Sequence, residues 1–129
     1  MPSAEHEQHI AHHDDVEIVW VHGGNGHGQS RLEEILRSAE LPAGTGYIWV
    51  AGETTAMRGA RRYLRHELKL PSSAYKVIGY WIAKAEEWNA RYEALPAQTL
   101  AELTALWATD RDEEEIEDEY VARLVALGL

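Results

Sequence analysis

Three short apolar runs alternate with two amphipathic segments over residues 16–81. The runs are Val16–His22, Tyr47–Gly52 and Tyr75–Trp81, and their β-branched and aromatic residues are typical of strands. Between them, apolar residues recur at helical spacing over 30–40 and again from Thr54 onwards. Strands that alternate with helices predict a parallel sheet with right-handed crossovers.

The second and third of these elements carry more specific signals. The run Tyr47–Gly52 is continuously apolar, which predicts a strand covered on both faces. The helix after it carries an apolar stripe, expected to face the core, and a basic stripe, expected to be exposed. The apolar stripe consists of Met57, Ala60, Leu64 and Leu68. The basic stripe consists of Arg58, Arg62, Arg65 and Lys69.

The pattern becomes wholly helical after Trp81. One segment covers 83–95, a second begins at Thr99, and a third runs from about Asp112 to Gly128. The chain therefore predicts a helical tail behind the alternating part.

These elements predict one domain preceded by a leader. The domain covers 16–129, of which 16–82 alternate strands and helices and 83–129 form the helical tail. Residues 1–15 are polar and predict a flexible leader. The expected class is α/β, a small three-layer parallel sheet with C-terminal helices. Since three strands make a small sheet, we expect the leader, another domain or another chain to supply a further strand or layer.

Composition narrows the class of protein. The chain has 129 residues, no cysteine and a formal net charge of −10. The length suits one domain, and the lack of cysteine excludes disulfides, thiolate metal sites and iron–sulfur clusters. No apolar run reaches the roughly 18 residues of a membrane helix, and no signal-peptide core is present. We expect a cytoplasmic protein without a membrane span, and one too acidic to bind nucleic acid broadly.

Charge is unevenly distributed along this acidic chain. Six of the twelve basic residues lie within 58–76, whereas acidic residues concentrate within 110–119. The basic stripe could bind an anionic ligand or an acidic partner. Alternatively, its arginines pair with the acids of 113–119 if the last helix folds back, at modest energetic worth.

Metal and hydrolase chemistry find little support. Four leader histidines, His6, His9, His12 and His13, have helical spacing, but no scaffold fixes them, and we predict no metal site. The acids of 112–115 suit the start of a helix. No Ser/His/Asp arrangement or pair of carboxylates stands out.

Nucleotide chemistry finds more support, because ligands bind at the carboxyl ends of parallel strands. The segments there, 22–30, 51–57 and 79–83, offer glycines, the start of a helix and a stacking pair, Tyr80 and Trp81. The glycines of 23–28 match neither a dinucleotide fingerprint nor a P-loop, and a flexible turn is the alternative. Ser30 and Arg31 could hold a 2′-phosphate, or be a helix cap and a solvated side chain.

Four motifs resemble the siderophore-interacting proteins, which are flavin-dependent ferric-siderophore reductases related in fold to ferredoxin–NADP reductases. They are Trp49–Glu53, Met57–Arg58, Arg61–Leu64 and Gly79–Trp81. Val19–His22 with its glycine loop, the acidic run 113–120 and the Leu-Gly-Leu ending also look similar. The resemblance covers roughly 16–129.

The resemblance implies an NAD(P)H-binding domain of the ferredoxin-reductase type. Residues 51–57 look like the element that approaches the nicotinamide, with alanine for cysteine and glutamate for proline. By this likeness Gly52, Glu53 and Thr54 would line the nicotinamide, Ser30 and Arg31 the adenosine phosphate. Tyr80 and Trp81 would lie near the flavin or reduced nicotinamide. The implied cofactor-binding set is Gly24, Ser30, Arg31, Ala51, Gly52, Glu53, Thr54, Met57, Tyr80 and Trp81.

The resemblance also implies partners. Family members pass hydride from NAD(P)H to FAD and then electrons to ferric iron, but this chain lacks the flavin-barrel motif and looks like their last portion. FAD would come from a missing or separate flavin domain or flavoprotein, and only then would the chain act as an oxidoreductase. A ferric siderophore and a homodimer are further expected partners.

Two alternatives remain open beside that implication. The chain could be a non-enzymatic siderophore- or partner-binding protein, with Arg58, Arg62, Arg65 and Lys69 as its face. The family motifs could also persist as packing elements, with Trp49 and Trp81 buried and Gly52 and Gly79 permitting close approach.

Overall fold

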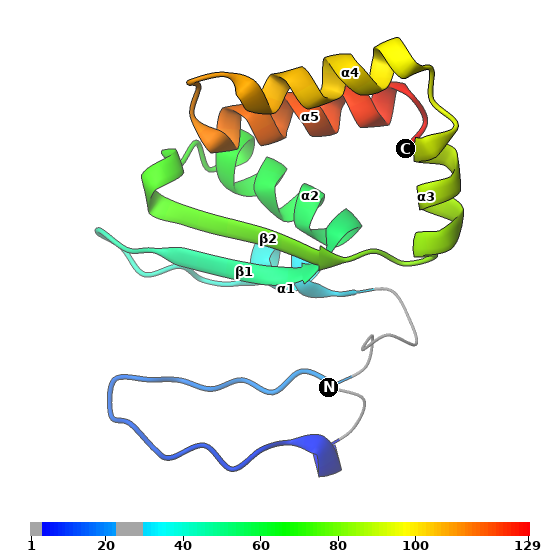
Figure 1. The fold of residues 1–129 in the computed structure, drawn as a ribbon. Helices are drawn as coiled ribbons and strands as arrows, with labels where there is room; N and C mark the ends of the chain where they lie inside the picture. Colours follow the sequence, from blue (N-terminus) through cyan, green and yellow to red (C-terminus); the bar gives the residue numbers. More distant parts are fainter. Residues whose placement is uncertain (1–3, 23–29) are drawn as a thin grey trace.

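Two parallel strands form the sheet around which the chain is arranged. The computed structural model describes residues 4–22 and 30–129. Within them, β1 (Ile48–Glu53) pairs with β2 (Tyr75–Trp81), with Ile48 opposite Tyr75 and a register shift after Gly52 (Figure 1). The helix α2 (Thr54–Arg62) connects the strands, as expected of a parallel crossover. The protein is therefore a mixed α/β protein with a small parallel sheet.

The core lies on one face of this sheet. The strands contribute Val50, Tyr75 and Val77, and the helices α1 (Leu32–Ser38) and α2 pack against one another beside them. Met57, Ala60 and Leu64 are at most 1% exposed, which confirms three positions of the predicted apolar stripe. The fourth, Leu68, is 37% exposed.

The exposure of Leu68 follows from how α2 ends. The α-helix changes into the π-helix η2 (Tyr63–Glu67), in which the N–H of Leu68 donates to the carbonyl of Tyr63. Lys69 then takes the left-handed conformation, with φ of 53°, that ends helices. The wider turn breaks the regular spacing from which a core position at 68 was predicted.

The opposite face of the sheet is not covered as predicted. Trp49 is 62% exposed and Tyr80 is 69% exposed, so the expectation that 47–52 is buried on both faces is wrong. Val50 and its partner Val77 face the core, and their neighbours along each strand face away because strand side chains alternate. The described residues do not form the second helix layer of a three-layer domain.

The first predicted strand is also absent. Residues 16–22 are described but form neither helix nor strand, and Val16 and Val19 are 54% and 72% exposed. A strand is stable only where another backbone completes its hydrogen bonds, and β1 pairs with β2 alone among the described residues. Within the described part of the chain, the predicted three-stranded sheet is therefore a two-stranded sheet.

The described residues before α1 form little regular structure. The short 3₁₀ helix η1 (Ala4–His6) is followed by residues 7–22, which are largely exposed. His22 contacts the carboxylate of Glu7 at 2.6 Å. The boundary at residue 15 stays a prediction.

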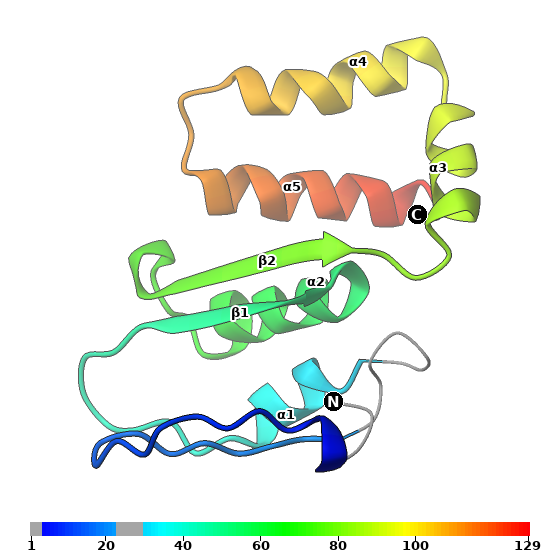
Figure 2. The same ribbon diagram turned by 60° about the horizontal axis from the view of Figure 1, so that its bottom comes forward.

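The predicted helical tail is present and consists of three α-helices. They are α3 (Ala85–Glu93), α4 (Ala97–Ala105) and α5 (Glu113–Ala126), with 3₁₀ turns at η3 (Ser72–Ala74) before β2 and η4 (Leu106–Ala108) after α4. The helices α4 and α5 run antiparallel, and α5 lies beyond β2 on the side away from β1 (Figure 2). No helix within 4–22 or 30–129 is long and apolar enough to cross a membrane.

The buried apolar stripe of α2 can be tested with a matched pair of leucines. Leu64→Ala should lower the free energy of unfolding by about 2–5 kcal/mol, because it leaves a cavity at a fully buried position. Leu68→Ala, at a partly exposed position, should cost about 1 kcal/mol or less. Urea unfolding followed by circular dichroism measures both, and equal losses would contradict the packing described here.

Candidate functional site

A pocket lies where both strands end and α2 begins. Parallel strands bring their carboxyl ends to one edge of the sheet, and here Glu53 and Trp81 are the last residues of β1 and β2. The pocket has a volume of about 380 Å³. Its lining consists of Ser30, Glu33, Glu53, Thr55, Ala56, Trp81 and Ala83. We call it the edge pocket.

Glu53 is the central polar group of the edge pocket. Its side chain accepts hydrogen bonds from the backbone N–H groups of Ala56 at 3.0 Å and Ala83 at 3.3 Å. It thereby caps α2 and ties the end of β2 to that helix. Burial alone would raise the pKa of Glu53, but the bonds from Ala56, Thr55 and Ala83 outweigh it and hold that pKa below its ordinary value. Glu53 is therefore a fixed carboxylate at neutral pH.

Two glycines allow the elements around the pocket to approach closely. A Cβ on Gly79 would lie 2.8 Å from Thr54 Oγ1, and one on Gly52 would lie 2.7 Å from Leu32 Cδ1. Thr54 Oγ1 also donates to the carbonyl of Trp81 at 2.8 Å. The close approach expected at both glycines is confirmed, whereas the burial expected of Trp49 is wrong.

The remaining predicted cofactor-binding residues lie elsewhere. Met57 is in the core at 1% exposure, and Tyr80 is exposed beside the pocket rather than in its lining. Ala51 is half-buried within β1, and Gly24 lies outside the described residues. The structure thus brings Ser30, Glu53 and Trp81 together and leaves the other members of the predicted set around or behind them.

Ser30 and Arg31 have partners within the chain. Ser30 Oγ accepts a long hydrogen bond from the N–H of Leu32 at 3.4 Å, near the start of α1. The Arg31 guanidinium donates two bonds, at 3.1 and 3.2 Å, to the Glu34 carboxylate, and this pairing raises the pKa of Arg31. Arg31 is exposed but ion-paired rather than simply solvated.

Four lining residues of the edge pocket are not members of the predicted cofactor-binding set. Thr55 and Ala56 directly follow Glu53, so their place at the first turn of a predicted helix was an available signal. Glu33 and Ala83 reach the pocket only through the packing of α1 and the turn after β2. Glu33 alone lies outside the segments expected at this edge, which are 22–30, 51–57 and 79–83.

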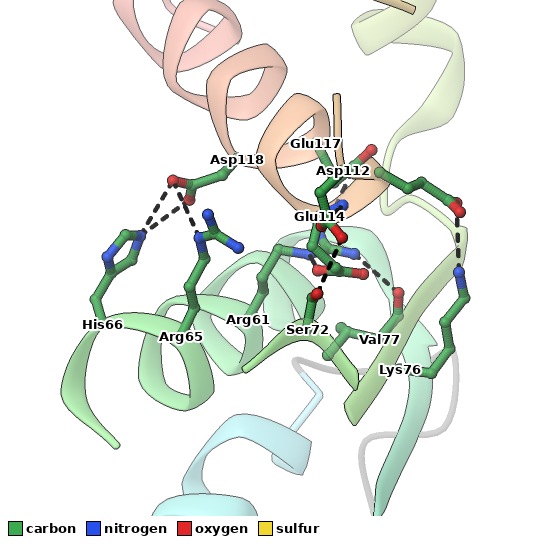
Figure 3. A network of polar contacts seen from close by, with 11 residues as sticks. Arg61, Arg65, His66, Ser72, Lys76, Val77, Asp112, Glu114, Glu117 and Asp118 are labelled. Atoms are coloured by element: carbon green, nitrogen blue, oxygen red, sulfur yellow. Dashed lines mark hydrogen bonds and ion pairs between the residues drawn. The ribbon is translucent and has the colours of Figure 1, made fainter. Parts of the chain in front are cut away.

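A second candidate site is the predicted basic face, from which Arg65, with its neighbours Arg61 and His66, contacts α5 (Figure 3). Arg61, which was not assigned to that face, is 8% exposed. Its Nε donates to Glu114 at 2.8 Å and its Nη2 donates to the carbonyl of Val77 at 2.9 Å. Its Nη1 lies 3.6 Å from Glu117. One buried guanidinium therefore joins α2, β2 and α5.

Weaker pairs surround this buried contact. Asp118 pairs with His66 at 3.1 Å and with Arg65 at 3.7 Å, and Lys76 pairs with Glu113 at 3.3 Å. Exposed pairs of this kind contribute up to about 1 kcal/mol each. The alternative in which arginines of the basic stripe pair with the acids of 113–119 is confirmed for Arg65, and Arg61, outside that stripe, also pairs with them.

The predicted basic stripe divides into two pairs of residues. Arg58 and Arg65 are half-buried, so the expectation that the whole stripe is exposed is wrong for them. Arg62 and Lys69 are exposed, and neither makes an ion pair with a described side chain. Across 4–22 and 30–129, no three His, Cys, Asp or Glu side chains gather as metal ligands.

Removing one partner of the buried ion pair should destabilise the fold strongly. Arg61→Met leaves Glu114 buried without its counter-ion, and we expect a loss of about 3–5 kcal/mol in the free energy of unfolding. The double variant Arg61→Met/Glu114→Leu should recover most of that loss, since no unpaired charge remains. Chemical denaturation of Arg61→Met, Glu114→Leu and the double variant measures how strongly the two side chains are coupled. If the losses of the two single variants simply add up in the double variant, the ion pair is not coupled and the expectation is refuted.

The capping role of Glu53 predicts a pH dependence. Because the pKa of Glu53 in the folded protein lies below its ordinary 4.5, its contribution is complete above that pH and is lost as pH falls through the folded value. Glu53→Gln should cost about 1–3 kcal/mol at pH 7, since a buried donor loses its acceptor. In unfolding curves, the difference in free energy of unfolding between Glu53→Gln and the parent chain should become smaller towards pH 3. Glu40→Gln, at an exposed loop position, should follow the parent chain throughout.

Comparison with known proteins adds one finding to this geometry. The family model described as "Siderophore-interacting protein" matches residues 1–84. The matched range holds both strands, α2 and every residue of the edge pocket, and it ends before α3. No curated protein and no solved structure matches the chain.

Proposed function

The chain belongs to the siderophore-interacting protein family, and from that membership we propose that it is an NAD(P)H-binding module. In this proposal it supports iron release from siderophores together with a flavin domain. The observation that carries the proposal is the edge pocket, which gathers Ser30, Glu53 and Trp81 at the carboxyl ends of parallel strands. All of its lining falls inside the range that matches the family.

The chemistry of the pocket suits the nicotinamide end of the cofactor. The Glu53 carboxylate, fixed by Ala56 and Ala83, can accept a hydrogen bond from a carboxamide N–H. The indole of Trp81 supplies an apolar surface for a planar ring. The volume of about 380 Å³ lies within the range of small-molecule sites.

The phosphates of the cofactor would bind away from Glu53. The start of α2 would attract an anion, but the carboxylate of Glu53 already occupies it. Glu33, the other acid in the lining, is ion-paired with Arg37 at 3.0 Å. Arg31 is the nearest candidate for the adenosine phosphates. It would have to exchange the carboxylate of Glu34 for phosphate, which the same bidentate geometry allows.

The redox step in this proposal needs a second component. Bound NAD(P)H supplies a hydride, and a flavin held by a partner domain or flavoprotein accepts it. The residues of this chain bind and orient the nicotinamide, with Glu53 on its carboxamide and Trp81 on its ring. The residues of β1 and β2 that carry these groups are held against α2 by the contact between Thr54 and Trp81.

The proposed site can be tested with two tryptophan variants. NADPH added to ¹⁵N-labelled protein should shift the amide signals of Glu53, Ala56 and Ala83, which surround the edge pocket. Trp81→Leu should weaken binding about 2- to 10-fold, the usual worth of an aromatic ring contact. Trp49→Leu removes an exposed indole from the other face of the sheet and should leave binding unchanged.

Two results would count against this function. NADPH that shifts no signal around Glu53 would reject the site, and equal weakening by both tryptophan variants would show that the edge pocket is not the binding surface. The second result would leave siderophore or partner binding without redox chemistry as the better account of the family match.

A further inference from the structure

A groove separates α2 from α5 on the side of the protein where the ion pairs lie. It has a volume of about 480 Å³, within the range of small-molecule sites. One wall comes from α2 and η2, through Arg58, Arg61, Arg62 and His66. The other comes from α5, through Asp118, Val121, Ala122 and Val125. The groove shares no lining residue with the edge pocket.

The spacing of the lining residues explains why the two walls face one another. On α5 they lie at i, i+3, i+4 and i+7, which is one face of a helix. On α2, Arg58, Arg61 and Arg62 have the same relation, and the π-turn at Tyr63–Glu67 lets His66 join them. Turns of this type inside helices occur frequently at functional sites.

The charges along the groove do not cancel. Arg61 is paired with Glu114 and Glu117, and Asp118, the one acid in the lining, is paired with His66 and Arg65. Among the described residues, no side-chain carboxylate lies within ion-pair distance of Arg62, whereas Arg58 donates to the oxygen of Leu129. The groove therefore presents the exposed Arg62 guanidinium without a side-chain counter-ion, although the net charge of the chain is −10.

Arg58 is incompletely satisfied within the groove. Its Nη1 donates to the backbone oxygen of Leu129 at 3.0 Å, while its Nε is buried and has no hydrogen-bond partner in the described part of the chain. Burial lowers the pKa of Arg58 because desolvation penalises the cation, although arginine stays protonated at neutral pH. An anion bound nearby would offset that penalty.

Beyond Asp118, the α5 wall of the groove is apolar. Val125 is 55% exposed, Val121 is half-buried, and Ala122 lies between them on the same face. Exposed apolar side chains next to guanidinium groups suit a ligand that has an anionic group and an apolar body. A fully hydrated inorganic anion would make no contact with the apolar residues of this wall.

We propose that the α2–α5 groove binds a small organic carboxylate with an apolar body. The carboxylate lies against Arg58 and Arg62, since planar guanidinium groups match carboxylate geometry. The apolar body lies on Val121 and Val125. This site does not depend on the nicotinamide site proposed above.

Titration of the full chain with sodium 2-naphthoate and sodium octanoate tests the groove. Both should cause saturable shifts in the amide signals of Arg62, Val121 and Val125. Tighter binding of 2-naphthoate would indicate an aromatic apolar body in the ligand, and tighter binding of octanoate an aliphatic one. Arg62→Gln should weaken binding about tenfold, the lower range for a charge-assisted hydrogen bond. Lys69→Gln removes an exposed cation outside the groove and should have no effect.

Neutral and inorganic probes complete the test. The neutral analogue 2-naphthamide should bind at least about tenfold more weakly than 2-naphthoate, because it carries no charge for Arg62. Val125→Ser should weaken 2-naphthoate without creating binding of inorganic phosphate.

The proposal is overturned if 2-naphthamide binds as well as 2-naphthoate, if Arg62→Gln has no effect, or if phosphate produces the same shifts. NADPH signals at Glu53 and Ala83 report separately on the edge pocket. Failure at the groove is therefore distinguishable from failure at the nicotinamide site.

Discussion

The buried guanidinium of Arg61 is the contact on which the arrangement of the C-terminal half depends. A charge removed from water must find partners, and Arg61 finds them on two other elements, in Glu114 of α5 and the carbonyl of Val77 in β2. Such a pair adds little net stability compared with apolar residues, but its geometry is demanding. The ion pair can form in only one position of α5 against α2. The α2–α5 groove exists because α5 is held in that position.

The helix α2 links the two proposed sites through its two ends. Its first turn is capped by Glu53, which also binds the turn after β2, so the edge pocket is shaped by the start of the helix. Its last turns contain Arg58, Arg61 and Arg62 and pass into the π-helix η2, so the groove is shaped by its end. The buried stripe of Met57, Ala60 and Leu64 fixes both ends relative to the sheet.

Local pattern predicted those elements that are stabilised by their immediate neighbours. Both strands of the sheet and all three tail helices were found, and Glu53 and Trp81 meet because the ends of parallel strands converge. Ser30 lies just before α1 and lines the same pocket. The strand at 16–22 was not found in the structure, since strand propensity supplies no partner backbone. The roles of Arg58 and Arg61 depend on where α5 packs against α2, and the exposure of Leu68 depends on where α2 changes into the π-helix η2. The helical spacing of residues in the sequence predicts neither of these positions.

The two proposed sites differ in electrostatic character, and local charge decides what each can bind. Glu53 makes the edge pocket negative, since Glu33 is paired with Arg37, and this favours a hydrogen-bond donor such as a carboxamide. The exposed guanidinium of Arg62 makes the groove positive, which favours a carboxylate. At physiological ionic strength, charges more than about 8 Å apart are largely screened. The net charge of −10 therefore governs how the whole chain meets other macromolecules, whereas each site selects its small ligand through the few groups that line it.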